Sequence, residues 1–358
     1  MLGTAAPAVS LAASRRLQAF LAERTRELTE LDAAAARLGT ELQRLAGAGG
    51  KHLRPAFVAA GAHAAAASSG EGVPEDAVAT VGAAVELTHL FALVHDDVMD
   101  GSPRRRGVPS VHASLAASRG EHAHVRDDAA WFGASGAILV GDLAMTWADD
   151  LLEDVDLPPA RRLALLRAMR RLRAEVIAGQ YLEVRGSGGV VDRPEEALRI
   201  AVLKSGRYTV TRPLQLGAAV VADDGPWCGV LARFGDAAGL AFQLRDDVLG
   251  LFGGPGRTGK GVLEDLRQGR PTALFVLARA RARDDARRRL QQLLATPEAG
   301  EAALTAVRDL VVTSGALAEV HAQIERCTDR ARRAVEDLPP AAREPLLDLL
   351  RLVVDRDR

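Results

Sequence analysis

Apolar residues recur at helical spacing along most of the chain. Residues 75–100 place valine, phenylalanine and alanine on one helical face, and residues 229–251 repeat the pattern. Breaks rich in glycine and proline separate such stretches, which run for roughly 15 to 30 residues. No stretch alternates with the period of two that is typical of a strand. The pattern predicts an all-α protein, built as a large bundle of about a dozen helices.

Some of the predicted helices are apolar nearly all round, notably residues 133–140 and 214–221. Helices of this kind lie in the interior of a large bundle or at a subunit interface, so we expect a homodimer. The breaks do not divide the chain into separate domains. We therefore expect a single domain over residues 1–358, with residues 1–20 as a flexible N-terminal segment.

Composition and charge narrow the class of protein. Hydrophobic residues make up 48% and aromatic residues only 4% of the 358 residues, which favours helices over strands. The 46 basic and 47 acidic side chains leave a net charge of −1, without the basic excess of a nucleic-acid partner. Two cysteines cannot form a disulfide framework, and the N-terminal arginines follow the apolar stretch, unlike a secretory signal.

The longest uncharged run, residues 55–70, contains a histidine and two serines. It falls short of the roughly 20 strongly apolar residues that a transmembrane helix needs. We therefore predict a cytoplasmic protein with no transmembrane segment and no nucleic-acid partner.

The first candidate site is the sequence FALVHDDVMDGSPRRRG at 91–107. Asp96 and Asp100 are four residues apart, so their carboxylates lie on one face of a helix. Like charges at this spacing repel, and acidic residues are unfavourable at a helix C-terminus, so stability alone does not explain them. Mg²⁺ binds one or two carboxylates together with substrate phosphates. Arg104, Arg105 and Arg106 follow, and their planar guanidinium groups suit diphosphate oxygens.

An isolated DDxxD sequence is also typical of an exposed helix end that nearby arginines neutralise. Here apolar residues directly precede the acids, which favours a helix that projects them into a cavity. A second apolar helix, AFQLRDDVLGLFG at 241–253, ends in another pair, Asp246 and Asp247. Two such pairs on apolar helices are less readily explained by chance than one.

Three basic stretches complete the pattern: GGKHLRP at 49–55, LKSGRYT at 203–209 and TGKGVLEDLRQGRPT at 258–272. Lys51 and Arg54 stand at the start of a predicted helix, where N–H groups bind anions. Neither a Walker A loop nor a GxGxxG motif is present. Acidic metal-binding patches opposite basic phosphate-binding ones indicate the metal-assisted departure of a diphosphate.

These motifs, together with GQYLEV at 179–184, occur in the order found in the trans-prenyltransferases, the isoprenyl diphosphate synthases of the polyprenyl synthetase family. The chain resembles geranylgeranyl diphosphate synthases in particular. The resemblance implies an all-α bundle around a central apolar cavity, usually as a homodimer. It implies head-to-tail condensation of isopentenyl diphosphate with an allylic diphosphate, through ionisation, condensation and elimination, with two or three Mg²⁺ ions.

The resemblance also assigns roles to individual residues. The metal ligands would be Asp96, Asp100, Asp246 and Asp247, with Asp97 in support, and these five join Arg105 and Lys204 as the catalytic groups. The isopentenyl diphosphate site would consist of Lys51, Arg54, His89 and Arg106. The allylic diphosphate would contact Arg105, Lys204, Ser205, Gln243, Lys260 and Arg270. One departure is Gly250, where the family often has a third aspartate, and it predicts weaker metal binding at the second motif.

Product length in this family depends on side chains below the first aspartates. Phe91 lies five residues before Asp96, and the small Ala92 follows it. A single bulky aromatic residue here resembles the arrangement in geranylgeranyl (C20) synthases. We therefore expect a C20 main product with Phe91 as the floor of the chain cavity.

Three alternatives remain at this point. A class I terpene cyclase shares the fold and the first motif but would not need the isopentenyl diphosphate residues. A farnesyl (C15) or longer-chain synthase would differ only in product length. A non-catalytic partner subunit would fit the missing third aspartate at Gly250.

Overall fold

The structure is a computed structural model that describes residues 5–119, 128–187, 191–223, 225–253, 269–295 and 300–355. Across these residues helices dominate, and the only strands are the short antiparallel pair β1 (Arg104–Arg105) and β2 (Val108–Pro109). The all-α prediction is confirmed. The chain divides into two compact units, each described below by itself. The expectation of a single domain stays a prediction.

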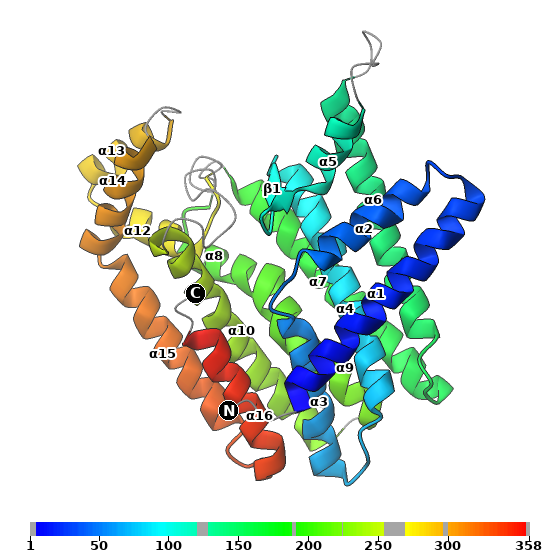
Figure 1. The fold of residues 1–358 in the computed structure, drawn as a ribbon. Helices are drawn as coiled ribbons and strands as arrows, with labels where there is room; N and C mark the ends of the chain where they lie inside the picture. The colour runs from blue at the N-terminus through cyan, green and yellow to red at the C-terminus, as the bar shows by residue number, and fades with distance from the viewer. Residues whose placement is uncertain are drawn as a thin grey trace. The chain divides into compact units, whose positions relative to one another are not determined.

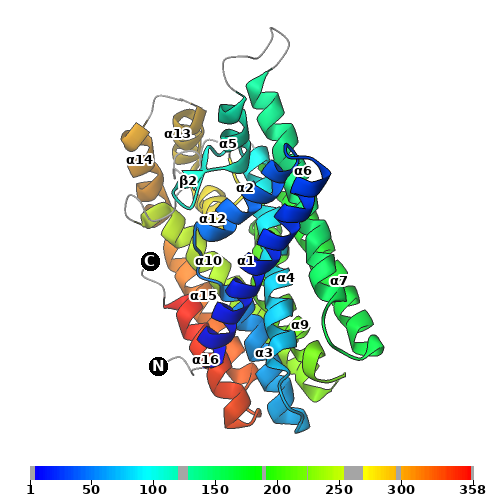
Figure 2. The ribbon, with the colours of Figure 1, turned by 45° about the vertical axis from the view of Figure 1, so that its right-hand side comes forward.

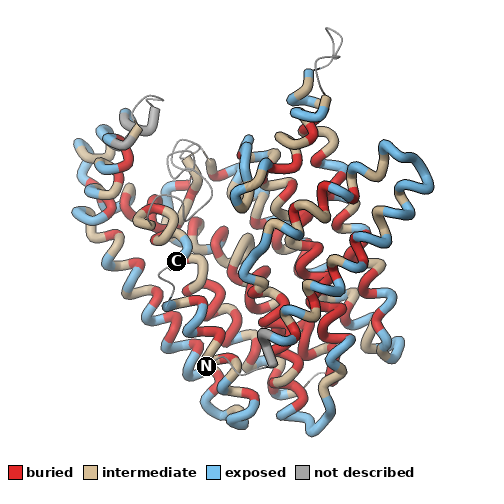
Figure 3. The backbone as a smooth tube through the Cα atoms, viewed as in Figure 1, coloured by how far each residue is buried: buried red, intermediate tan, exposed pale blue. Residues whose placement is uncertain are grey.

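Unit 1 comprises Met1–Met169 and Pro213–Gly225. Its helices are α1 (Ala5–Leu31), α2 (Ala36–Gly47), α3 (Leu53–Ser69), α4 (Glu75–Met99), α5 (Val111–Ser118), α6 (Ala129–Glu153), the first part of α7 (Pro159–Gly186) and α9 (Arg212–Val221). Helix α4 is the core helix, packed on α6, α1 and α3 (Figure 1). Its many alanine and valine residues are buried, which explains its apolar sequence (Figure 3).

Glycine allows α3 and α9 to pack backbone against backbone. A Cβ atom on Gly61 would lie 2.0 Å from the carbonyl oxygen of Leu214. A Cβ atom on Gly217 would lie 1.8 Å from the carbonyl oxygen of Val58. No side chain fits either distance, so both positions require glycine.

Residues 5–20, expected to be a flexible N-terminal segment, lie in α1. Val9, Ala13, Leu17 and Phe20 are buried at helical spacing, and Phe20 makes an edge-on ring contact with Trp147 of α6 at 6.3 Å. The burial of this apolar stripe holds α1 on its unit. The helical spacing of these apolar residues is present in the sequence, but the many small residues of the N-terminus obscure it.

Two described helices, α4 and α6, are long and apolar enough to cross a membrane by length and composition alone. The most apolar window of α4 is 83% buried in the protein, whereas that of α6 is only 28% buried. Burial in the core therefore accounts for α4. Helix α6 instead presents Trp131, Ile138 and Leu139 on its exposed surface.

Unit 2 comprises Arg170–Arg212 and Pro226–Arg358. It contains the rest of α7, followed by α8 (Pro194–Ala201), the π-helix η2 (Val202–Thr211), α10 (Pro226–Phe252), α12 (Ala273–Arg281), α13 (Asp284–Ala295), α14 (Gly300–Thr313), α15 (Ala316–Ala334) and α16 (Pro340–Val354). Helices α10 and α15 run side by side and form the centre of this unit (Figures 1 and 2).

Candidate active site

The first aspartate motif lies at the C-terminal end of α4. Asp96 and Asp100 are half-buried and one helical turn apart, as predicted, and Asp97 is 1% exposed. The chain then turns into the β1–β2 hairpin, which carries the three predicted arginines back towards the end of α4. The local sequence therefore brings acids and arginines together without any long-range contact.

Arg105 binds the first aspartate pair directly. Its Nε donates to Asp97 Oδ1 at 2.9 Å and to Oδ2 at 3.2 Å, and its Nη2 donates to Asp96 Oδ2 at 3.2 Å. Burial lowers the pKa of Arg105, but the hydrogen bonds to Asp97 and the charges of Asp97, Asp96 and Asp100 outweigh it and raise the pKa above its ordinary value. Asp97 is therefore an ion-paired acid that holds Arg105 against the motif.

The remaining carboxylates suit a divalent cation of the Mg²⁺ type. Within the described part of the chain, no group of three or more His, Cys, Asp and Glu side chains is arranged to hold a metal ion. Asp96 and Asp100 offer two carboxylates on one helical face. Because Mg²⁺ usually takes one or two protein carboxylates and fills its shell with water and substrate phosphate, this pair fits.

The hairpin places Arg106 in an unusual backbone conformation. Arg105 pairs with Val108, so Arg106 and Gly107 form the two-residue turn, with φ values of 52° and 79°. Turns with two positive φ values match the twist of a hairpin but favour Asn-Gly over Arg-Gly. A non-glycine residue in this region is strained, and such strain clusters at functional sites.

His89 lies among the predicted isopentenyl diphosphate residues. Burial lowers its pKa well below its usual range, and the charges of Arg54, Arg106 and Arg105 lower it further. The imidazole is therefore neutral at pH 7 and donates only one N–H. The structure thus brings together three of the four predicted residues of this site, while Lys51 is exposed in the loop before α3.

The second aspartate motif lies near the C-terminal end of α10 in unit 2. Asp246 is exposed and Asp247 is half-buried, with Gln243 Nε2 donating to Asp247 Oδ1 at 2.7 Å. Burial raises the pKa of Asp247 to about 7, and the charges of Asp246 and Glu183 raise it too, against the hydrogen bonds from Gln243 and the Ala273 N–H. In the absence of a cation, this carboxyl group is therefore partly protonated near neutral pH.

Gly250 occupies the position of the missing third aspartate. A Cβ atom built there would meet no other atom within 4 Å, so the space that a side chain would need is open. The absence of a carboxylate is consequently not a matter of packing.

Lys204 lies in η2, a ten-residue π-helix. Its ammonium group forms an ion pair with Glu183 of α7, within the GQYLEV sequence. A Cβ atom on Gly179 of the same sequence would lie 2.5 Å from the Lys204 backbone nitrogen, so this glycine lets η2 approach α7. Long π-helical turns are rare and are found mostly at functional sites.

Three further residues were predicted to contact the allylic diphosphate. Ser205 and Arg270 are half-buried, in η2 and before α12 respectively. Lys260 lies outside the described residues. The roles assigned to all these residues stay predictions.

Phe91 and Ala92 point in different directions from α4. The Phe91 ring is buried and lies edge-on to the His95 ring, with centroids 4.9 Å apart. His95 Nε2 lies 3.0 Å from the carbonyl oxygen of Ile138, so this side faces α6. Ala92, four residues before Asp96, shares the face of the metal-binding pair instead.

Two acidic residues, one in each unit, were not among the assigned site residues. Glu86 is 3% exposed and lies 3.9 Å from Arg106, and Glu183 pairs with Lys204. Glu86 stands one helical turn before His89, a spacing that the sequence contained. Glu183 lies within GQYLEV, one of the motifs that carry the family resemblance.

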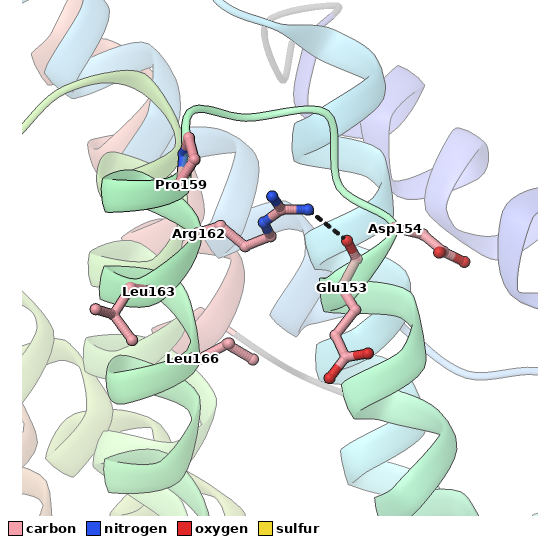
Figure 4. A pocket seen from close by; sticks show the side chains of 6 residues that line it. All are labelled: Glu153, Asp154, Pro159, Arg162, Leu163 and Leu166. Atoms are coloured by element: carbon pink, nitrogen blue, oxygen red, sulfur yellow. Dashed lines mark hydrogen bonds between the residues drawn. The ribbon is translucent and has the colours of Figure 1, made fainter.

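A surface pocket lies away from these residues, at the turn between α6 and α7 (Figure 4). Its walls are Glu153, Asp154, Pro159, Arg162, Leu163 and Leu166. Arg162 Nη1 donates to the carbonyl oxygen of Glu153 at 3.0 Å, which closes the turn. None of the predicted site residues lines this pocket, so we assign it no role in the chemistry.

Comparison with known proteins supports the isoprenyl diphosphate synthase class that the motifs indicate. The family model of the polyprenyl synthetases matches residues 35–311. The geranylgeranyl diphosphate synthase of Mycobacterium tuberculosis is 35% identical over 320 residues, covering 87% of this chain and 81% of that protein. The all-trans-nonaprenyl-diphosphate synthase of Rhodobacter capsulatus is 30% identical over 310 residues, covering 86% of each chain.

Among solved structures, the geranylgeranyl pyrophosphate synthase of Corynebacterium glutamicum, complexed with isoprenyl diphosphate and magnesium, aligns with a TM-score of 0.89. It is 31% identical and covers 97% of this chain and 98% of its own. The chain belongs to the polyprenyl synthetase family. It is a prenyltransferase of the trans-prenyl diphosphate synthase class.

Proposed function

We propose that this prenyltransferase condenses isopentenyl diphosphate with allylic diphosphates and releases mainly geranylgeranyl diphosphate. The observation that carries the proposal is the pair of sites on α4: the acids Asp96 and Asp100, and a cationic cluster around His89 two turns earlier. Two separate diphosphate-binding features on one helix suit a reaction of two diphosphates. A class I cyclase binds only one, so the second feature favours the synthase.

The residues divide the work of the reaction. Asp96 and Asp100 would hold Mg²⁺, as would Asp246 and Asp247 of the second motif. When bound, the metal stabilises the departing allylic diphosphate as a Lewis acid. The bound magnesium and isoprenyl diphosphate of the Corynebacterium glutamicum relative support this assignment.

The cationic cluster binds and orients the second substrate. Arg54 and Arg106 supply charge for the isopentenyl diphosphate, while neutral His89 donates a single hydrogen bond and keeps its protonation state around pH 7. This places the double bond for attack on the allylic cation. The released diphosphate, an anion set free beside the new carbocation, would take the proton, and no covalent enzyme intermediate is needed.

Product length is proposed to depend on both Phe91 and Ala92. The small Ala92 leaves room on the face of α4 that carries Asp96, and buried Phe91 supports the wall towards α6. Relatives range from farnesyl to nonaprenyl diphosphate synthases, so similarity alone does not fix the product. We expect Phe91→Ala to lengthen the products and Ala92→Phe to shorten them towards C15, as measured by chromatography of the dephosphorylated alcohols.

The activity is tested with radiolabelled isopentenyl diphosphate, Mg²⁺ and C5, C10 or C15 primers. A main C20 product supports the proposal in full, while C15 or longer products would correct only the chain length. Cyclic hydrocarbon from the allylic substrate alone would favour the cyclase. No product from the purified protein, together with no effect of Asp96→Ala, would favour the partner subunit.

We also propose a homodimer formed through α6. The exposed Trp131, Ile138 and Leu139 give this helix an apolar surface that a second copy would cover. Leu139→Lys should convert the dimer to a monomer in light-scattering measurements, whereas Leu11→Lys, at an equally exposed leucine on α1, should not. A monomeric wild-type protein would contradict the proposal.

A further inference from the structure

Glu86 is a buried acid to which the proposed reaction has so far assigned no role. Its charge is also not explained by packing of the apolar core. It lies on α4, ten residues before Asp96, and is 3% exposed. Buried carboxylates are costly unless cations or hydrogen bonds compensate them. Its Oε1 lies 3.7 Å from His52 Nδ1 and 3.9 Å from Arg106 Nη2, and its Oε2 has no hydrogen-bond partner within the described part of the chain.

Both partners of Glu86 occupy strained backbone positions. His52 and Arg106 have φ values of 43° and 52°, and they are the two non-glycine residues with positive φ among the described residues. Each belongs to a different loop: His52 precedes α3, and Arg106 forms the tip of the β1–β2 hairpin. Strain of this kind persists only where the surroundings hold it, and Glu86 is the charge that both loops share.

The Arg106 side chain is also fitted closely to the first of these loops. A Cβ atom on Gly50 would lie 3.1 Å from the guanidinium carbon of Arg106. The glycine therefore leaves the space in which this guanidinium group lies. Position 50 and the carboxylate of Glu86 together fix where the Arg106 charge stands.

We propose that Glu86 is a positioning residue for isopentenyl diphosphate: its buried carboxylate orients Arg106 and His52 so that the cationic cluster is preorganised. The inference rests on the proposed role of Arg106 in binding that substrate. Preorganised charges bind more strongly because no free energy is spent on arranging them. At 3% exposure, Glu86 is shielded from direct contact with a substrate and would act through its cationic neighbours.

A simpler role would be charge compensation, in which Glu86 only weakens the positive field of the arginines. The two roles predict opposite changes in the affinity for isopentenyl diphosphate when the charge of Glu86 is removed. If Glu86 positions Arg106, removing its charge weakens binding of isopentenyl diphosphate. If it only compensates charge, removing it strengthens the attraction for an anion.

The test is Glu86→Gln, which keeps the shape and removes the charge. We expect the KM for isopentenyl diphosphate to rise about tenfold, as for the loss of one charge-assisted contact, with the KM for the allylic primer changed less than twofold. Glu41→Gln is the matched control, because Glu41 is also a buried acid of unit 1 that pairs with two arginines, Arg37 and Arg44. It should lower stability without this selective change in KM.

Gly50→Ala tests the same idea without touching the carboxylate, and it serves if Glu86→Gln does not fold. The added methyl group would lie 3.1 Å from the Arg106 guanidinium carbon and would push this group slightly aside, so it should raise the KM for isopentenyl diphosphate selectively but by less than Glu86→Gln. In an Arg106→Met background, which removes the charge that Glu86 contacts, Glu86→Gln should add less than a twofold effect.

An unchanged or lowered KM for isopentenyl diphosphate in Glu86→Gln would overturn the inference, as would a full tenfold effect in the Arg106→Met background. If Gly50→Ala alone is available, an unchanged KM overturns it. The wild-type enzyme separates this inference from the proposed function. If the wild type condenses nothing, the proposed function fails; if it condenses normally, only the role of Glu86 is in question.

Discussion

Asp97 in unit 1 and Asp247 in unit 2 each follow the first acid of an Asp-Asp pair, yet they have different partners. Asp97 is paired with Arg105, whose guanidinium group also reaches Asp96. Asp247 is hydrogen-bonded by the neutral amide of Gln243 and lies near the charges of Asp246 and Glu183. The pKa of Asp247 rises to about 7 as a result of burial and these like charges.

The same Asp-Asp pattern at the end of an apolar helix therefore occurs in two different electrostatic environments. In the first motif the guanidinium group of Arg105 pairs with Asp97 and reaches Asp96, so a fixed positive charge already lies beside these carboxylates. Within the described part of the chain, the hydrogen bond to the Asp247 side chain comes from the neutral amide of Gln243, and a proton partly takes the place of a cation. Metal binding at the second motif is therefore expected to be coupled to release of the proton from Asp247.

The largest expected effect concerns the first motif. Asp96→Asn should lower kcat by about 10³-fold, because it removes a ligand of the metal that stabilises the leaving diphosphate. Steady-state kinetics at saturating Mg²⁺ would measure this. The control is Asp76→Asn, in the first turn of the same helix, which should change kcat less than twofold. Full activity of Asp96→Asn would contradict the assignment of this motif.

The second prediction concerns stability and pH without metal. The raised pKa means that folded Asp247 holds its proton more tightly than the unfolded chain does, so this contribution is present below its ordinary value of 3.8 and lost as pH rises to about 7. Asp247→Asn removes this loss of stability. The gain in unfolding free energy of the metal-free variant over the wild type should therefore be larger at pH 8 than at pH 4 by on the order of 2–4 kcal/mol.

Denaturant unfolding in EDTA across this pH range measures the effect. Asp236→Asn is the control, since its carboxylate is paired with Arg207, and it should keep the wild-type pH dependence. Parallel curves for the wild type and Asp247→Asn would show that Asp247 is ionised throughout.

The smallest expected effect concerns Gly250. Gly250→Asp places a third carboxylate one turn after Asp246, in space that is open to a side chain. It should lower the Mg²⁺ concentration for half-maximal activity about threefold, since an added ligand charge tightens binding. Gly250→Asn controls for size, and an equal effect of both variants would mean that charge is not the cause.

Local patterns made the helices and acid pairs predictable. The 3.6-residue period predicted α4 and α10, and the i, i+4 spacing placed Asp96 and Asp100 on one face. The order of the motifs along the chain then indicated a prenyl diphosphate synthase, and this class of enzyme is confirmed. The same arithmetic separates Phe91 from Asp96 by about 140° around the helix, so its contact with His95 on the α6 side could also have been calculated.

Other features depend on tertiary contacts that no local pattern encodes. The hairpin turn at Arg106 lacks the usual Asn-Gly signature, so its positive φ was not foreseeable. The raised pKa of Asp247 depends on burial and on Glu183, a residue distant in sequence. Glu86 reads as an ordinary helical glutamate until its burial beside Arg106 is known.

Proton release on Mg²⁺ binding tests the central contrast most directly. Calorimetric titration of the protein with Mg²⁺ and inorganic diphosphate, in buffers of different ionisation enthalpy at pH 6, counts the protons released. Because the pKa of Asp247 is about 7, we expect the wild type to release close to one more proton than Asp247→Asn. The same count in both proteins would show that the two aspartate motifs do not differ in their protonation.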